Sequence, residues 1–168
     1  LWNTTESATK ITEVANGSGA LTQVWVLVNP TAGNHNLVAA WTGTAGQCAI
    51  ISAGVSNVHQ TTPVITTDTQ TASGVSSDAS ITIPSDTNGA TLATSSNINN
   101  YYSSTQNQTL IANTVSGSVG HIASYALGGS SNGHTLTALS SVSWGTIGIH
   151  IQAAAAGTGM PYYAYQQQ

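Results

Sequence analysis

The sequence has very few charged side chains. Arginine is absent, Lys10 is the only basic residue, and charged residues make up 4% of the chain, against about 25% in typical proteins. Because the neutralisation of phosphates supplies most of the affinity of a protein for DNA or RNA, we expect no nucleic-acid binding. Copies of so weakly charged a chain also repel one another weakly, so like subunits can associate at little electrostatic cost.

Cysteine and long apolar runs are also scarce. Cys48 is the only cysteine, so no disulfide can form within the chain. No cation lies near it in the sequence, and the apolar residues that follow, Ala49 to Ile51, predict a buried strand thiol. No run approaches the roughly 18 apolar residues that a membrane helix needs, so we expect no membrane-spanning segment.

The sequence is rich instead in short runs of Val, Ile, Thr, Trp and Tyr between Gly, Asn, Ser and Pro, which is typical of an all-β protein. The clearest signal is a first hairpin, in which Lys10–Val14 and Leu21–Val28 flank the turn-forming pair Asn16-Gly17. Further strands are expected at 48–55, 80–83, 90–95, 109–116, 121–126, 134–139 and 144–152. The last of these alternates well, with Ile147, Ile149 and Ile151 on one face.

Two polar stretches, 61–77 and 95–108, are interpreted as surface loops or an irregular edge. For residues 1–152 the whole pattern predicts an all-β fold, an antiparallel two-sheet β-sandwich of jelly-roll or immunoglobulin-like type. Residues 153–168 differ, because an Ala/Gly-rich connector leads there into an uncharged Tyr/Gln-rich C-terminal tail. Chain ends are often disordered, yet tyrosine buries a large area at low entropy cost, so a tail that packs on a neighbouring subunit is equally compatible with the sequence.

The strands and turns resemble a known group of domains. The resemblance is carried by Lys10–Val14, Asn16–Ser18, Val24–Pro30, Gly33–His35, Val58–Pro63 and, as a closing strand, Trp144–Gln152. Over residues 1–152 the chain resembles a family of uncharacterised all-β sandwich domains found in secreted bacterial and archaeal surface proteins and in phage structural proteins. The resemblance implies a sandwich fold and a surface setting, and it brings no catalytic residue.

In that family further strands precede the segment that matches residues 1–14. Without them one sheet edge would be open, and proteins close such edges by covering or pairing them. We therefore expect a strand of a neighbouring subunit to pair there. The candidate subunit contacts are Leu1, Trp2, Tyr162, Tyr163 and Tyr165.

Few residues are available for acid–base chemistry. Of the five carboxylates, Asp68, Asp78 and Asp86 lie in Ser/Thr/Gly-rich segments, where aspartate commonly forms turns. Residues 129–133 match the G-x-S-x-G pattern but lie between two expected strands instead of between a strand and a helix. We predict no catalytic residue and no enzymatic activity.

The five histidines are widely spaced and have no cysteine companion of the zinc type. His121, His134 and His150 are expected on strands, so a metal site would require a sheet that makes them neighbours. We predict no metal and no cofactor, and we expect these rings to be exposed or hydrogen-bonded.

Three N-x-[ST] sequons, at Asn3, Asn16 and Asn107, are candidate glycosylation sites. Asn16 heads the expected hairpin turn and Asn107 lies near the end of a polar stretch, so we expect all three to be accessible. Attached sugar would help to keep a nearly uncharged surface soluble.

These features favour a structural role. We predict a subunit that self-assembles with copies of itself into an extracellular filament, a pilus-like fibre or another assembly at the cell surface. One alternative is a capsid or tail protein of a phage or virus, which would place the chain in a virion. A second is a carbohydrate-binding or adhesive module that binds glycans on exposed aromatics. The aromatics considered for it are Trp2, Trp41, Tyr101, Tyr102 and Trp144.

Overall fold

The computed structural model describes residues 5–40, 47–98, 102–106 and 108–154. These residues form β-strands and no helix, and every strand pair is antiparallel. The described residues include no helix long and apolar enough to cross a bilayer. The predicted tail, apart from its first two residues, lies outside the described residues.

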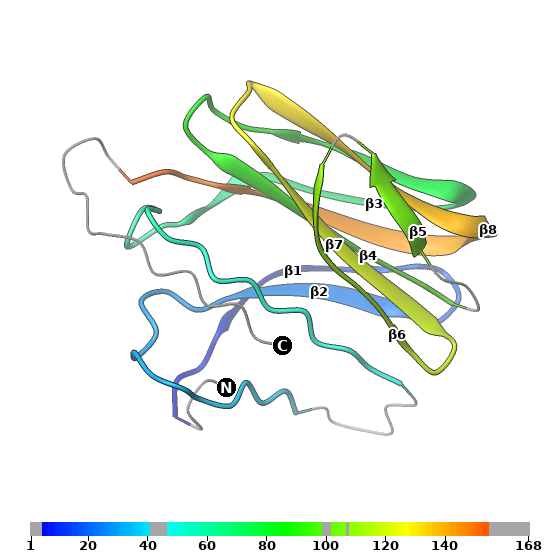
Figure 1. The fold of residues 1–168 in the computed structure, drawn as a ribbon, viewed down its shortest axis with the longest axis horizontal. Helices are drawn as coiled ribbons and strands as arrows, with labels where there is room; N and C mark the ends of the chain where they lie inside the picture. Colours follow the sequence, from blue (N-terminus) through cyan, green and yellow to red (C-terminus); the bar gives the residue numbers. More distant parts are fainter. Residues whose placement is uncertain (1–4, 41–46, 99–101, 107, 155–168) are drawn as a thin grey trace.

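The eight described strands form a hairpin and a larger sheet (Figure 1). In chain order they are β1 (Thr9–Ala15), β2 (Leu21–Val26), β3 (Val64–Pro84), β4 (Ala90–Ile98), β5 (Tyr102–Gln106), β6 (Thr109–Ser116), β7 (Val119–Leu127) and β8 (Ser131–Ile151). β1 pairs with β2, and the larger sheet has the order β3-β8-β4-β7-β6, with β5 also paired to β8. The hairpin lies against one face of the larger sheet, which confirms the predicted antiparallel β-sandwich.

The larger sheet folds over on itself because β8 bends. Its first part, around Leu136, lies between β3 and β5, whereas its second part, Trp144–Ile151, lies between β3 and β4. Between these parts the register shifts. Thr137 of β8 pairs with Asp78 and Val142 pairs with Ser76, so five steps along β8 correspond to only two along β3. The extra β8 residues form a bulge, and bulges bend the strand that carries them. The first part of β8 therefore lies over β4 and β7.

Two apolar cores lie on opposite faces of β4 and of the second part of β8. On the hairpin side, the alternating residues Ile147, Ile149 and Ile151 are buried, as predicted, against valines of β1 and β2. On the folded-over side, Tyr102, Ile122, Leu136, Ala138 and Trp144 form the main cluster. Burial of each large aliphatic side chain stabilises the fold by about 1.5–3 kcal/mol.

Hydroxyl groups fill much of the remaining interior. Thr22 of β2 and Ser96 of β4 share a hydrogen bond of 2.6 Å, and Thr146 Oγ1 donates to Ser95 Oγ at 2.7 Å. Ser95 also bonds the hydroxyl of Tyr102, whose pKa burial raises to about 12. Because buried hydroxyls with partners cost little, serine and threonine can occupy interior strand positions here.

Several strand predictions need correction. Most of 61–77 belongs to β3, an edge strand with two register shifts, so the irregular edge and not the loop is the correct interpretation there. Most of 95–108 belongs to β4 and β5, so the loop interpretation was wrong there too. The strand expected at 48–55 is absent from the described residues, and Cys48 is exposed instead of buried. A run of suitable residues forms a strand only where a neighbouring strand offers backbone partners, and none of the described strands pairs with this segment.

Candidate functional site

The outer edge of β3 is the longest open edge among the described strands. β3 pairs only with β8, so along its 21 residues one row of backbone N–H and C=O groups has no strand partner in the described part of the chain. Its segment Gln70–Ser76 pairs in regular register with β8 and contains no charged residue or proline. Proteins usually protect such edges with lysine, proline or bulges. This segment has none of them.

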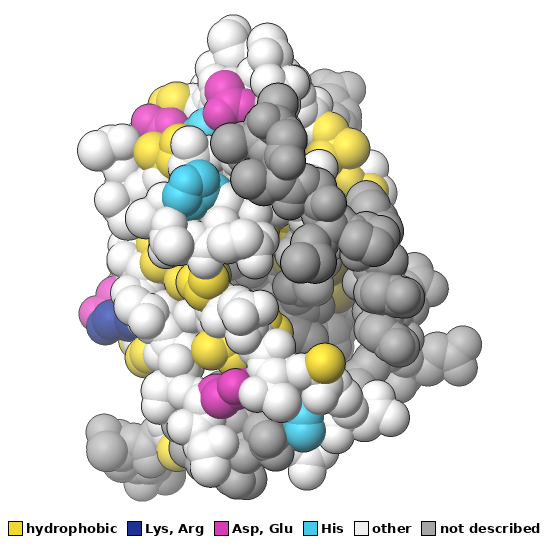
Figure 2. All heavy atoms as spheres, turned by 90° about the vertical axis from the view of Figure 1, so that its left-hand side faces the viewer, with side chains coloured by type: hydrophobic (Ala, Val, Ile, Leu, Met, Phe, Trp, Pro, Cys, Tyr) yellow, Lys and Arg dark blue, Asp and Glu magenta, His cyan; other side chains and the backbone are white. Residues whose placement is uncertain are grey.

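The only interruptions of the edge lie at its flanks. The register shifts between Ile65 and Gln70 and again between Ser76 and Asp78, and Asp68 and Asp78 are at these two places. Val75, at the centre of the open edge, has 73% of its surface exposed. Figure 2 shows that charged side chains form only small separate patches on one face of the molecule. Between these two places the β3 edge is therefore uncharged and partly apolar, and its outer backbone groups have no strand partner among the described residues.

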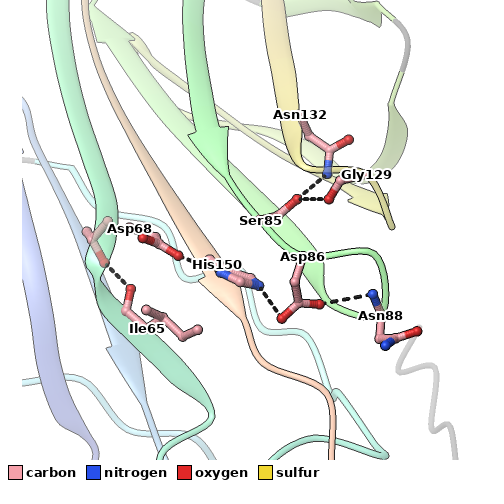
Figure 3. Close-up of polar contacts among 9 residues, drawn as sticks. Ile65, Asp68, Ser85, Asp86, Asn88, Gly129, Asn132 and His150 are labelled. Atoms are coloured by element: carbon pink, nitrogen blue, oxygen red, sulfur yellow. Dashed lines mark hydrogen bonds and ion pairs between the residues drawn. The ribbon is translucent and has the colours of Figure 1, made fainter.

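The one carboxylate–histidine cluster in the described residues lies near the start of β3. His150 of β8 bonds Asp68 from Nδ1 to Oδ2 at 2.8 Å, and its Nε2 lies 3.5 Å from Oδ2 of Asp86. Figure 3 shows the imidazole between the two carboxylates. The side chain of His150 is 2% exposed, that of Asp68 28% and that of Asp86 49%, so the cluster has a buried ring and solvent-facing acids.

Local backbone features bring these three residues together. Ile65 of β3 pairs with His150 and Gln70 pairs with Gly148, so five steps along β3 correspond to two along β8. The resulting bulge in β3 places Asp68 beside the imidazole of His150. Asp86 lies in the turn after β3, where its Oδ1 accepts a hydrogen bond from the backbone N–H of Asn88 at 2.9 Å. The predicted turn role is confirmed for Asp86 but is wrong for Asp68, which lies within β3. Their convergence on His150 was not predicted.

Gly89 provides space for the ring. A Cβ at this position would lie 2.5 Å from Nε2 of His150 and 2.9 Å from the carbonyl oxygen of Ile151. Contacts that short require the ring or the β8 backbone to move. Glycine at position 89 is therefore required by the packing of the cluster.

The chemistry open to the cluster is limited by its partners. In the described residues His150 forms no hydrogen bond with a hydroxyl or thiol, and its Nε2 has no hydrogen-bond partner, with Oδ2 of Asp86 3.5 Å away. A nucleophile would have to lie within hydrogen-bond reach of the base. The described residues also contain no group of three or more His, Cys, Asp or Glu side chains suited to hold a metal ion. The geometry fits a structural role, in which His150 and the two aspartates link the β3 bulge, the β3–β4 turn and β8. We call these three residues the His150 clamp.

A second buried histidine lies on the first part of β8. His134 is fully buried, and its Nε2 and Nδ1 form hydrogen bonds of 2.8 and 2.9 Å with the hydroxyls of Thr91 and Ser124. Burial lowers the pKa of this ring to about 4, so it is neutral at physiological pH. The ring pins the folded-over layer to β4 and β7. His121 lies on β7, and burial lowers its pKa as well.

Of the candidate site residues from the sequence, only Asn16 is described. The expectation that its side chain is accessible is wrong, since it is 4% exposed. Its Oδ1 accepts from the backbone N–H groups of Ser18 and Ala20, and its Nδ2 donates to the carbonyl of Ser143. Leu1, Trp2, Asn3, Asn107, Tyr162, Tyr163 and Tyr165 lie outside the described residues. Glycosylation and the subunit contacts stay predictions.

The aromatics considered as a sugar platform are not where that hypothesis needs them. Tyr102 and Trp144 are buried in the core, and Trp144 Nε1 donates to Ser76 Oγ at 2.9 Å. Trp2, Trp41 and Tyr101 lie outside the described residues. Of the two tryptophans that the structure describes, the exposed one is Trp25 of β2. Its outward position follows from the alternation Thr22, Val24, Val26, whose side chains face the core, and that signal was present in the sequence.

Comparison of the chain with family models, with curated protein sequences and with solved structures finds no match. The resemblance to secreted and phage all-β domains therefore stays a prediction, and no family is assigned.

Proposed function

We propose that the chain is a structural subunit that self-assembles into an extracellular filament, a pilus-like fibre or a similar surface assembly, and that the outer edge of β3 accepts a strand of the next copy, head to tail. The observation that supports this proposal is the uncharged segment Gln70–Ser76, which offers regular backbone groups without a strand partner among the described residues. An added strand would bond to that backbone directly, as in β-strand addition.

The composition of the surface supports the same proposal. Backbone pairing supplies affinity at any exposed edge, so most soluble proteins prevent it with charge. This chain has one lysine and no arginine with which to do so, and its net charge is −4. Apart from Gln70 the residues of the segment are small, none is charged, and Val75 is apolar and exposed, so a neighbouring strand meets no charge and little bulk.

Two lysine variants test the proposal. Val75→Lys introduces a charge at the centre of the β3 edge, and Leu127→Lys introduces the same charge at the end of β7, where the side chain is 74% exposed against 73% for Val75. We expect the wild type and Leu127→Lys to form high-mass polymers in analytical ultracentrifugation and negative-stain images. Val75→Lys should remain monomeric, because its charge would have to lie against a neighbouring strand.

The proposal fails if the wild type stays monomeric at millimolar concentration, or if both lysine variants polymerise alike. Circular dichroism of both variants checks that the β-sheet content is unchanged. Because both substituted side chains are largely exposed, neither change removes core packing.

A further inference from the structure

The outer face of the β1–β2 hairpin carries an exposed tryptophan in a connected row of polar side chains. Thr22, Val24 and Val26 face the core, so Gln23 and Trp25 face outward. Trp25 has 53% of its surface exposed. The core does not require an indole there, since the inward valines already cover the isoleucines of β8.

Three hydrogen bonds fix this outer face. Nε1 of Trp25 donates to Oε1 of Gln23 at 3.2 Å, and Nε2 of Gln23 donates to Oε2 of Glu13 at 2.8 Å. Nζ of Lys10 donates to the same Glu13 oxygen at 2.9 Å. The bonds from Lys10 and Gln23, with the charge of Lys10, lower the pKa of Glu13. Four exposed side chains thus hold one another in place, which reduces the entropy lost when a ligand binds.

The strand register sets the shape of the row. Trp25 lies opposite Lys10, and Gln23 lies opposite Glu13. Residues two apart on a strand are about 6.6–6.8 Å apart, so the indole face and the Gln23–Glu13 pair lie side by side at a spacing close to the width of one sugar ring with its hydroxyls. The result is an aromatic surface next to a carboxylate, an amide and an ammonium group.

We propose that this face binds a neutral polysaccharide, with one pyranose ring on the indole of Trp25 and its hydroxyls bonded to Gln23 and Glu13. A pyranose has an apolar C–H face and a rim of hydroxyls, and an indole with fixed polar neighbours matches both. The charges of Lys10 and Glu13 cancel, which favours a neutral ligand over an acidic or basic one. The row is also small compared with the roughly 800 Å² that each partner of a stable protein complex buries.

This site is independent of the assembly proposed above, because it lies on the outer face of the hairpin and not on the β3 edge. It uses none of the aromatics considered from the sequence. A surface subunit with such a face would carry a polysaccharide contact on every copy, and repeated weak sites on one assembly gain strength through multivalency.

Native gel electrophoresis of the full chain in gels that contain barley β-glucan, galactomannan or hydroxyethyl cellulose tests the proposal, with alginate as the anionic comparison. We expect at least one neutral polymer to retard the protein and alginate not to do so. Trp25→Ala should weaken the retardation about tenfold or more, Gln23→Ala should weaken it less, and Trp25→Tyr should restore part of it. Leu127→Ala removes an exposed apolar side chain elsewhere and should have no effect.

Three results would overturn the proposal: no retardation by any neutral polymer, equal retardation of Trp25→Ala and wild type, or retardation by alginate alone. Loss of polymer formation in Trp25→Ala, without any change in retardation, would assign the face to a second copy of the chain and would also overturn it. Continued polymer formation by a Trp25→Ala variant that no longer binds glucan separates this site from the β3 edge. If Trp25→Ala folds poorly, Gln23→Ala still tests the proposal, provided that its thermal unfolding is unchanged: its retardation should be weaker than that of the wild type, and equal retardation would contradict the proposal.

Discussion

His134 and His150 lie on the same strand and are both almost completely buried, yet they are held in different ways. His134 is bonded on both nitrogens by neutral hydroxyls, from Thr91 and Ser124. His150 instead faces carboxylates with both nitrogens. The hydroxyls around His134 belong to strands deep in the fold, whereas Asp68 and Asp86 are partly open to water. If the ring is removed, water cannot reach the hydroxyls around His134, whereas it can reach the carboxylates around His150.

The largest difference is expected when each ring is replaced by leucine. His134→Leu keeps the volume but leaves the hydroxyls of Thr91 and Ser124 buried without that partner, so we expect a loss of about 3 kcal/mol in the free energy of unfolding. His150→Leu should lose only about 1–2 kcal/mol, because Asp68 and Asp86 can regain water. Urea denaturation at pH 7 measures both. Equal losses would show that the type of partner does not matter.

Gly89→Ala challenges the clamp around His150 without removing any of its members. The added Cβ would lie 2.5 Å from Nε2 of His150 and 2.9 Å from the carbonyl oxygen of Ile151, so we expect a loss of about 2–3 kcal/mol from forced displacement of packed atoms. Gly133→Ala is the matched control, since a Cβ there meets nothing within 4 Å. Thermal unfolding of the pair should separate them clearly, and similar midpoints would contradict the tight packing at residue 89.

The parts of the fold that were predicted from the sequence are those with local signals. The hairpin around Asn16-Gly17 and the alternating isoleucines of β8 follow from turn chemistry and period two. Of β3 only 80–83 was predicted. The rest was missed because an edge strand needs few apolar residues, and its polar side chains have the composition of a loop. Buried serines of β4 were missed for a related reason, since their partners come from strands distant in the sequence.

The cluster of His150, Asp68 and Asp86 could not be predicted from the sequence, because its residues meet only in the folded sheet. Asp68 and His150 are 82 residues apart, and only the register between β3 and β8 brings them together. That register includes a bulge for which the sequence gives no clear signal. Asp86 was correctly placed in a turn, but the ring it faces belongs to the last strand. The exposure of Trp25, by contrast, follows from simple alternation along β2.

The pKa of His134 predicts how the free energy of unfolding depends on pH. In the unfolded chain this ring binds a proton below about pH 6.5, whereas burial keeps it neutral in the folded protein until about pH 4. Its contribution is therefore complete above pH 6.5 and is lost as the pH falls towards 4. Between pH 7.5 and 5 we expect it to cost about 2 kcal/mol. His134→Gln can bond both hydroxyls without titrating, so its unfolding free energy should fall less over this range.

Burial also lowers the pKa of His121, which adds a slope of the same sign in both proteins and cancels in the difference between them. Denaturant titrations of wild type and His134→Gln at half-unit pH steps provide the comparison. Parallel curves would mean that His134 is not the source of the acid sensitivity.

The smallest effects are expected when the two acids of the clamp are compared with each other. Asp68→Asn weakens a 2.8 Å bond to a buried ring, at a side chain only 28% exposed, so we expect a loss of about 1 kcal/mol. Asp86 is 49% exposed and 3.5 Å from Nε2, and asparagine can still accept from the N–H of Asn88. For Asp86→Asn we therefore expect less than about 0.5 kcal/mol, because a half-exposed carboxylate keeps much of its water. Chemical denaturation of both variants and the wild type at pH 7 measures the two losses. A larger loss for Asp86→Asn than for Asp68→Asn would mean that the turn, and not the β3 bulge, supplies the main partner of His150.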